Sequence, residues 1–519
     1  MFSLKQKAVV LSALALIGCS SDDNSSNNNS ETNLQKGLNG HLTHIGSYST
    51  GSVNEDGGIA EIVVYNKDNK KIYMVNGALG SIDIVNADTL LSDKFTHMRL
   101  YKRIDIAAMA GDKGFSYGDV TSVDVDTKND IIALSVQAKG YADNGSIVIL
   151  NYEGEFLKRY EAGVQPDMIC FADEGRYILS ANEGEPREGY GEIDPKGSVT
   201  IVDMSEDTVK TVDFTAFDAR RGDLANSGVI LKKGSLPSND FEPEYIAVSG
   251  QTAFVSLQEA NAAAMLDIAK GEFTDIKPLG FKNHNAAALD AVKDGVINIA
   301  AQNLYGAYMP DGIAIFEVNG GKYLLTANEG DAREWGSDTD ITDSLKINGK
   351  KVETIDISQK DGLETDKNYL LGGRSFSIYN TADMTQIYDS GSDFEEFIAQ
   401  YYPAFFNASH TNNELDSRSG KKGPEPEYIT AAKTNEKIYA FTGLERFGGV
   451  MAYDITDPFN PQFYDYINTR NFNGTELAQM GDLGVEGLHA VSSEDSPTNR
   501  TILFTANEVS GTIAVFEIR

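Results

Sequence analysis

The sequence is poor in the residues that carry most familiar catalytic chemistry. Its 519 residues include 2 cysteines, 1 tryptophan and 6 histidines. The histidines are scattered, and no HExxH, GxSxG, Walker, GxGxxG or CxxC pattern occurs. These absences argue against zinc peptidases, α/β-hydrolases, P-loop enzymes and nucleotide-dependent dehydrogenases. Any catalysis would therefore depend on a metal held by carboxylates.

Basic residues are also few. The chain has 44 lysines and arginines against 77 aspartates and glutamates, for a formal net charge of −33. Nucleic-acid binding needs clustered basic side chains that neutralise phosphates, so nucleic acid is excluded as a partner. The excess of acid favours either cation binding or simple solubility outside the cell as a monomer.

The N-terminus has the pattern of a secretory signal. Lys5 and Lys7 precede an apolar run over 8–17, and Gly18-Cys19 follows. A run this short is typical of a cleaved signal peptide. The Gly-Cys junction resembles a bacterial lipobox, which predicts a signal peptide over 1–18 and lipidation of Cys19. The alternative is an ordinary signal peptide with a cysteine there by chance.

The segment after Cys19 is expected to be a flexible tether. Residues 19–37 are rich in Ser, Asn and Asp and have little to bury. The acids directly after the cysteine resemble the export signal of some surface lipoproteins. We therefore expect an outer-membrane lipoprotein exposed on the cell surface and attached to the membrane only by its lipid. A periplasm-facing orientation is the alternative.

The other cysteine, Cys170, lies in the apolar stretch MICF (168–171). With Cys19 lipidated, no disulfide partner is left for it, so the fold must depend on its core alone. We interpret Cys170 as a small buried hydrophobe rather than a nucleophile.

A repeated unit runs along the rest of the chain. In each copy an acidic residue opens an apolar strand, and a second strand ends on Asn, Gln or Glu. The clearest copies are QPDMI to ANEG (165–184), EPEYI to LQE (242–259), MPDGI to ANEG (309–330) and EPEYI to LER (425–446). Weaker copies begin near 60, 121 and 485. Such a period is the mark of a repeat architecture.

The repeats predict an all-β protein that forms a single β-propeller over 38–519. A third strand with a leading glycine recurs in the repeats, as in GSIVIL (145–150) and GTIAVFEI (511–518), which fits one four-stranded blade per repeat. We expect seven blades, with residues 42–48 added to the last blade to close the ring. An eight-bladed ring is the alternative, because 331–424 is long enough to contain a degenerate blade. The best helix candidate is 395–402.

The repeat also predicts where a site must lie. In a propeller the first strand of each blade lines the central channel, so the acids that open these strands should meet at one rim. The strand-end residues should gather beside them. The predicted metal-site residues are Glu61, Asp167, Asn182, Glu183, Glu244, Asp311, Asn328, Glu329, Glu427, Glu486, Asn507 and Glu508.

So many oxygen ligands without clustered His or Cys favour Ca²⁺, with Mg²⁺ or Mn²⁺ as alternatives. The structural alternative is that the acids cap turns and pair with basic residues to hold the blades in register. The basic residues concerned are Arg187, Arg333, Arg374, Arg418 and Arg446.

Long insertions are expected over 331–371 and 391–424, covering one face of the ring. The first contains DTDITD (338–343), which resembles part of a calcium loop but lacks the central glycine and the distal glutamate. Trp335 beside it is interpreted as a packing residue. His284 and His410 fall in connecting loops, where we expect hydrogen-bonding roles.

Several longer strings resemble the choice-of-anchor I family. They include ANEGEPRE (181–188), EPEYIAVS (242–249), TANEGDAR (326–333) and GLERFGGVMAYDITDP (443–458). The resemblance extends over about 41–519 and implies a secreted propeller held at the cell by an anchor. Animal relatives are linked to calcium mineral, and some bacterial ones are labelled alkaline phosphatase. The resemblance supplies no catalytic residue for this chain.

The sequence therefore predicts a surface-anchored, Ca²⁺-binding propeller without catalysis, for binding or adhesion. Its expected partner is an extracellular glycan, protein or phosphate-bearing ligand. The alternative is a metal-dependent phosphomonoesterase or other hydrolase in the channel.

Overall fold

Seven sheets of four or five strands form the body of the protein. The computed structural model describes residues 34–190, 192–335, 338–434 and 437–519. Cys19 and the predicted signal peptide lie outside them. Residues 34–519 form one compact unit, and Gln35 Nε2 donates a 2.8 Å hydrogen bond to the Asn468 carbonyl.

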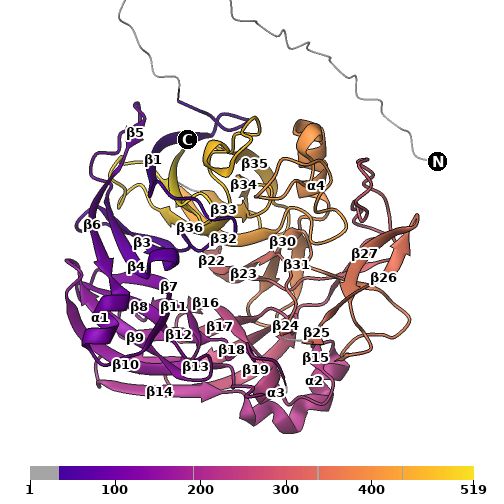
Figure 1. The fold of residues 1–519 in the computed structure, drawn as a ribbon, viewed down its shortest axis with the longest axis horizontal. Helices are drawn as coiled ribbons and strands as arrows, with labels where there is room; N and C mark the ends of the chain where they lie inside the picture. Colours follow the sequence, from indigo (N-terminus) through magenta and orange to yellow (C-terminus); the bar gives the residue numbers. More distant parts are fainter. Residues whose placement is uncertain (1–33, 191, 336–337, 435–436) are drawn as a thin grey trace, which may run out of the picture. The chain divides into compact units, whose positions relative to one another are not determined.

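The blades follow one another along the chain (Figure 1). Blade 1 contains β2 (Val63–Asn66), β3 (Lys71–Asn76), β4 (Ser81–Asn86) and β6 (Arg99–Asp105). Blade 2 contains β7 (Tyr117–Asp126), β8 (Ile131–Ala138), β9 (Asn144–Asn151) and β10 (Phe156–Val164). Blade 3 contains β11 (Pro166–Ala172), β12 (Tyr177–Asn182), β13 (Ser198–Asp203) and β14 (Thr208–Asp213). Blade 4 contains β16 (Pro243–Ser249), β17 (Thr252–Leu257), β18 (Ala262–Asp267) and β19 (Glu272–Pro278).

The second half completes the ring. Blade 5 contains β22 (Ile313–Val318), β23 (Gly321–Asn328), β30 (Ser375–Asn380) and β31 (Gln386–Asp389). Blade 6 contains β32 (Pro426–Thr434), β33 (Lys437–Leu444), β34 (Val450–Asp454) and β35 (Gln462–Ile467). Blade 7 contains β36 (Val485–Val491), β37 (Ile502–Asn507), β38 (Thr512–Ile518), β1 (Leu42–Ser49) and the short β5 (Thr96–His97).

The ring closes as the sequence predicts. Strand β1 pairs antiparallel with β38, with Leu42 opposite Ile518 and Ser49 opposite Thr512. The innermost strands contact one another in the order β2, β7, β11, β16, β22, β32 and β36, and β36 contacts β2 again. Residues from both ends of the chain therefore share blade 7, which leaves the last repeat without a bare edge.

The core lies between the blades rather than at the centre of the ring. Each of the seven blade interfaces has its own cluster of buried apolar residues. Aliphatic and aromatic side chains of the alternating strands fill the space between each pair of twisted sheets. The channel is thus left to the side chains of the innermost strands.

The eight-blade alternative is wrong. Residues 331–424 complete blade 5 and otherwise form small additions: β24 (Glu334–Trp335) with β25 (Asp338–Thr339), and β26 (Ile341–Ile347) with β27 (Lys350–Ile355). The predicted helix is present as α4 (Asp393–Tyr401). The Glu353 amide donates a 3.0 Å hydrogen bond to the Gly420 carbonyl, so the two long insertions contact each other.

Two further insertions flank blade 4 and were not anticipated. The remaining described elements are α1 (Ile106–Asp112), α2 (Arg221–Ser227), β15 (Leu231–Lys232), α3 (Pro237–Asp240), β20 (Phe281–Asn283), β21 (Tyr305–Ala307), β28 (Lys360–Asp361) and β29 (Tyr369–Leu371). Strand β15 pairs with β28, and β21 pairs with β29. These insertions are therefore tied to the one that follows β23. None of the described helices is long and apolar enough to cross a membrane.

Candidate functional site: an acidic mouth of the channel

A cavity of about 340 Å³ opens at one end of the channel and is lined mainly by carboxylates. We call it the acidic mouth. Its lining comprises Asp167, Glu183, Glu185, Glu244, Tyr245, Gln258, Glu259, Asp311, Glu329, Asp331, Lys422, Glu427, Glu445, Arg446, Glu486 and Glu508. The repeat pattern predicted this convergence, and eight of its acids were in the predicted set.

The backbone explains why the first acid of each copy faces the channel. Strands β11, β16, β32 and β36 each have a register irregularity at this point, for example between Pro166 and Ile169. A β-bulge of this kind bends the strand and redirects a side chain. The proline before Asp167, Glu244 and Glu427 lacks an N–H and so suits the interrupted pairing.

Burial makes these carboxyls weaker acids than they are in water. Loss of solvent is the main cause that raises the pKa of Glu244, Asp311, Glu427 and Glu486 well above the ordinary values, and their carboxylate neighbours add to it. The same cause raises the pKa of Asp167 to about 6. Carboxyls with such raised pKa values are poised to exchange protons for a cation.

Three groups of side chains bring their ligand atoms within 4.8 Å of one another. The first is Asp167, Glu183 and Glu244, the second is Glu329, Glu427 and Glu445, and the third is His410, Glu445 and Glu508. Oxygens on one Ca²⁺ lie 2.3–2.6 Å from the ion, so atoms this close can share it. Glu427 adds an independent sign, because its Oε2 is buried without a hydrogen-bond partner and the side chain is only 8% exposed.

Basic residues at the mouth engage other acids. Arg446 Nε lies 3.0 Å from Glu425 Oε2, and Lys422 Nζ lies 3.3 Å from the same oxygen. Both cations lower the pKa of Glu425 despite its burial, so that group stays ionised. Lys422 also pairs with Glu329. The structural alternative therefore accounts for Glu425 and for ion pairs at Glu329 and Glu445. It does not account for the acids that open the innermost strands.

Pairing with arginine also holds some of the predicted residues. Arg187 NH2 lies 3.3 Å from Glu183 Oε2, and its Nε lies 2.7 Å from Glu185 Oε2. Arg374 pairs with Glu395 at 2.8 Å, away from the mouth lining. Arg418 pairs with Glu425. Glu183 thus has two roles open to it, as an arginine partner and as a member of the first ligand group.

The predicted asparagines lie apart from the mouth lining. Asn182, Asn328 and Asn507 are buried at the ends of their strands. The Asn328 amide donates to Ser377 Oγ at 2.8 Å, and Asn182 and Asn507 bond in the same way to hydroxyls of their own blades. These amides join strands within a blade, and we leave them out of the cation site.

Glu61 lies one step deeper in the channel. It lines a cavity of about 90 Å³ together with Asp167, Glu486 and Glu508. Its Oε2 is buried without a hydrogen-bond partner. Desolvation, with help from Asp119 and Asp167, raises its pKa well above the ordinary value.

Other predicted features resolve differently. Asp340 of the partial calcium loop is buried and pairs with Lys360, so its carboxylate is already engaged. His284 forms a hydrogen bond within its loop, as expected, because its Nδ1 lies 2.9 Å from the Ala287 carbonyl oxygen. Trp335 is half-buried in β24. Cys170 is also half-buried, because it borders the channel, and burial raises the pKa of its thiol.

Sequence reasoning missed several mouth residues. Glu185 and Asp331 each follow a predicted glutamate by two positions, in ANEGE and ANEGD, so this signal was visible. Lys422 comes from the insertion before β32, where no repeat marks it. His410 was expected to be a loop residue, and only the fold brings its Nδ1 to 3.2 Å from Glu445 Oε1.

The fold and the site define a seven-bladed β-propeller with a carboxylate-rich channel mouth. A sequence model of the choice-of-anchor I domain matches residues 61–458. The chain belongs to the choice-of-anchor I family, as the sequence resemblance indicated.

Two curated relatives are similar to parts of this chain. Gigasin-3a of Magallana gigas is 31% identical over 180 residues, which are 32% of this chain and 63% of that protein. The mesenchyme-specific cell surface glycoprotein of Strongylocentrotus purpuratus is 25% identical over 337 residues, 54% of this chain and 41% of the relative. The chain thus spans less than two thirds of the length of either relative.

Solved structures of low sequence identity have a similar arrangement of strands. Hydrazine synthase of Kuenenia stuttgartiensis aligns with a TM-score of 0.46 and 12% identity, over 90% of this chain and 97% of the other. The WD40 domain of Neurospora crassa Pan2 aligns with a TM-score of 0.45 and 9% identity, over 93% and 98%. Similarity at this level carries no statement about activity.

Proposed function

We propose that this protein is a cell-surface β-propeller that binds Ca²⁺ at its acidic mouth and serves in binding or adhesion. The observation that carries the proposal is the presence of two complete ligand groups and two carboxylates of the third in one cavity, with a buried, unpartnered oxygen on Glu427. Ca²⁺ accepts six to eight oxygen ligands in flexible geometry, which suits many carboxylates on separate strands. Mg²⁺ needs near-octahedral ligands at shorter distances and fits this cavity less well.

Charge supports the same conclusion. Carboxylates forced together in a partly buried cavity repel one another, and their raised pKa values express that cost. A divalent ion removes the repulsion by replacing the protons. Binding to the native state alone must then raise the free energy of unfolding.

The location rests on the sequence and on one relative. The N-terminal segment has the lipobox-like Gly18-Cys19, and the sea-urchin relative is named a cell surface glycoprotein. We propose a lipid on Cys19 that holds the propeller at the outer membrane, facing outward. Cys19→Ser should shift the protein from the membrane to the soluble fraction, and protease added to intact cells should degrade the wild type. A Cys19→Ser protein that stays in the membrane would refute the anchor.

The test of the cation site compares melting temperature and bound metal in Ca²⁺ and in chelator. We expect Ca²⁺ to raise the melting temperature, and Glu427→Gln to remove most of that increase. Glu206→Gln is the matched control, because Glu206 is exposed and lies outside the mouth. Equal melting temperatures in Ca²⁺ and chelator, with no bound metal, would refute the proposal.

A second candidate is a metal-dependent phosphomonoesterase. The observation that favours it is the presence of Lys422 and Arg446 in the same cavity as the ligand groups, where cations can hold a phosphate. Both are already paired with acids, which weakens the case. Hydrolysis of p-nitrophenyl phosphate that needs a metal and is lost in Lys422→Met would establish this function. Cation binding without turnover would leave the binding propeller.

A further inference from the structure

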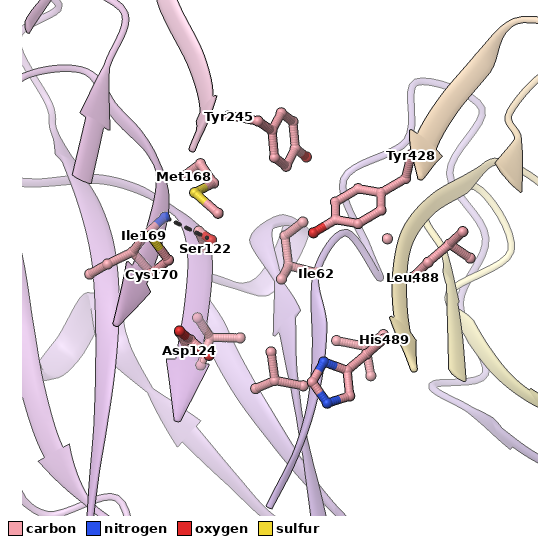
Figure 2. Close-up of a pocket in the computed structure, with 14 residues that line it drawn as sticks. Ile62, Ser122, Asp124, Met168, Ile169, Cys170, Tyr245, Tyr428, Leu488 and His489 are labelled. Carbon is pink, nitrogen blue, oxygen red and sulfur yellow. Dashed lines mark hydrogen bonds between the residues drawn. The ribbon is translucent and has the colours of Figure 1, made fainter. Parts of the chain in front are cut away.

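Behind the acidic mouth the channel contains a second cavity of about 160 Å³ (Figure 2). We call it the inner cavity. It lies among the innermost strands of six blades and is lined by Ile62, Val63, Val64, Ser122, Val123, Asp124, Met168, Ile169, Cys170, Tyr245, Tyr428, Gly487, Leu488 and His489. Apolar and polar groups share its walls about equally, whereas the mouth is almost entirely polar.

The mouth, the smaller cavity with Glu61 and the inner cavity adjoin one another along the channel. Tyr245 lines the mouth, the inner cavity and the smaller cavity that contains Glu61. Met168 and Ser122 are shared by the smaller cavity and the inner one. A molecule that enters from the mouth therefore passes carboxylates before it reaches the inner cavity.

Two tyrosines stand at the mouth side of the inner cavity. The rings of Tyr245 and Tyr428 meet edge to face, with centroids 5.2 Å apart and planes at 87°. Figure 2 shows them across the cavity from Asp124 and His489, with Met168 and Ile62 between. Aromatic rings of this kind attract cations through their negative faces.

The far wall carries one negative group. Asp124 accepts backbone hydrogen bonds of 2.8 Å from Phe171 and from Val125. Burial raises its pKa to about 6, so the carboxylate is ionised at neutral pH. His489 also lines the inner cavity, and burial lowers its pKa to about 4, so the imidazole is neutral and does not repel a cation.

We propose that the inner cavity binds a small organic ammonium ion, with its charge between Asp124 and the two tyrosines and its carbon groups against the apolar side chains of the wall. The proposal concerns a different cavity from the Ca²⁺ site and does not depend on it. An organic ammonium loses less hydration than a metal ion when buried, and it needs no shell of oxygen ligands.

Other ligand classes fit the inner cavity less well. A divalent metal needs six or more oxygens, whereas the lining offers a single carboxylate that already accepts two backbone hydrogen bonds. An anion in the inner cavity would lie near the Asp124 carboxylate, which repels it. A neutral apolar molecule would bury Asp124 without compensating its charge.

The experiment uses the full-length chain, once in chelator and once in saturating Ca²⁺. Tetramethylammonium chloride is titrated by calorimetry, and the ring signals of His489 are followed by NMR. We expect one saturable site, a shift of the His489 signals, and no competition by added Ca²⁺. Tert-butanol, which has a similar shape without charge, should give no saturable binding.

Variants separate the two interactions. Asp124→Asn and Tyr428→Leu should each weaken tetramethylammonium binding about fivefold or more, equivalent to roughly 1 kcal/mol. Tyr428→Phe keeps the ring and should bind like the wild type. If the leucine variant fails to fold, Asp124→Asn carries the test. Glu206→Gln is the control outside the channel.

Three results would overturn the proposal. The first is equal binding of tert-butanol, which would make the inner cavity an apolar site. The second is displacement of tetramethylammonium by Ca²⁺ without a shift at His489, which would place the ammonium in the mouth. The third is unchanged affinity in the folded Asp124→Asn variant.

Discussion

Gln258 Nε2 donates a 2.8 Å hydrogen bond to Glu329 Oε2 and so joins blade 4 to blade 5 at the acidic mouth. Lys422, from the insertion before β32, holds the other oxygen of the same carboxylate. Glu329 is thereby oriented by two neighbours, whereas Glu427 in the same ligand group has a free oxygen. The mouth thus combines fixed and unsatisfied carboxylates, an arrangement that supports the proposed Ca²⁺ site.

The pH dependence of stability follows from the mouth. Burial raises the pKa of Glu259, Glu329 and Glu508 from 4.5 to about 7. Between these values the folded protein holds more protons than the unfolded chain, so the free energy of unfolding falls as the pH rises. In chelator we expect the melting temperature to drop by several degrees from pH 5.5 to pH 8. A melting temperature that rises over this range would contradict the prediction.

Calcium should oppose the fall in melting temperature at higher pH. The ion competes with the protons, so its stabilisation should be small at pH 5.5 and larger at pH 8. Melting curves at both pH values, with Ca²⁺ and with chelator, measure the difference. An increase in melting temperature that is equal at both pH values would show that the ion binds elsewhere.

Glu244→Gln tests whether repulsion among the mouth carboxylates destabilises the folded protein. Burial and the surrounding acids raise the pKa of Glu244, so removing its charge should raise the melting temperature of the cation-free protein at pH 8. The same substitution should weaken Ca²⁺ binding about tenfold, because it removes a member of the first ligand group. Calorimetric titration of Ca²⁺ and melting curves in chelator check both effects. A variant that gains stability and keeps full affinity would exclude Glu244 as a ligand.

Arg333 is expected to be a structural residue. It is buried, and its Nε donates a 2.7 Å hydrogen bond to Glu242, while Asp240, Glu259 and Asp340 lie 3.8 Å from its guanidinium nitrogens. Arg333→Met would strand these buried acids, at a cost of about 3–5 kcal/mol in the free energy of unfolding. Urea unfolding measures it. Arg220→Met, at the half-exposed pair with Asp275, is the control and should change little.

Strand β1 is expected to be essential for a soluble ring. A chain that begins at residue 51 lacks β1 and leaves the edge of β38 unpaired. We expect it to aggregate, whereas a chain that begins at residue 34 should stay monomeric. Size-exclusion chromatography with light scattering distinguishes the two. A monomeric, cooperatively folding chain without β1 would show that ring closure is dispensable.

The repeat predicted the blades because each copy carries its own strand pattern and turns. QPDMI and EPEYI mark innermost strands, and these became β11, β16 and β32. Period-2 patterning and turn residues act over a few positions, so they can be interpreted without tertiary information. The same local logic placed Asp167, Glu244 and Glu427 at the start of these strands, facing one rim.

The predicted asparagines are not part of the mouth, so the local pattern was not sufficient to place them. Asn182 and Glu183 are adjacent in the sequence, but in a strand neighbouring side chains point to opposite sides. Glu183 therefore lines the mouth, while the Asn182 amide bonds to Thr200 within its blade. The sequence analysis assigned both to the site because both lie at the end of the same strand.

The sequence by itself determined the ring, its closure by the N-terminal strand and the convergence of acids at one mouth, because each depends on a local pattern repeated in every blade. Only the tertiary structure decided which acids are neutralised. From an insertion that no repeat marks, Lys422 reaches the mouth and pairs with Glu329, and His410 contacts Glu445. The inner cavity was also hidden from the sequence, because Tyr245, Tyr428 and Asp124 come together only when strands from three blades close around one axis. Such contacts depend on the spacing of whole blades, which short-range patterns do not encode.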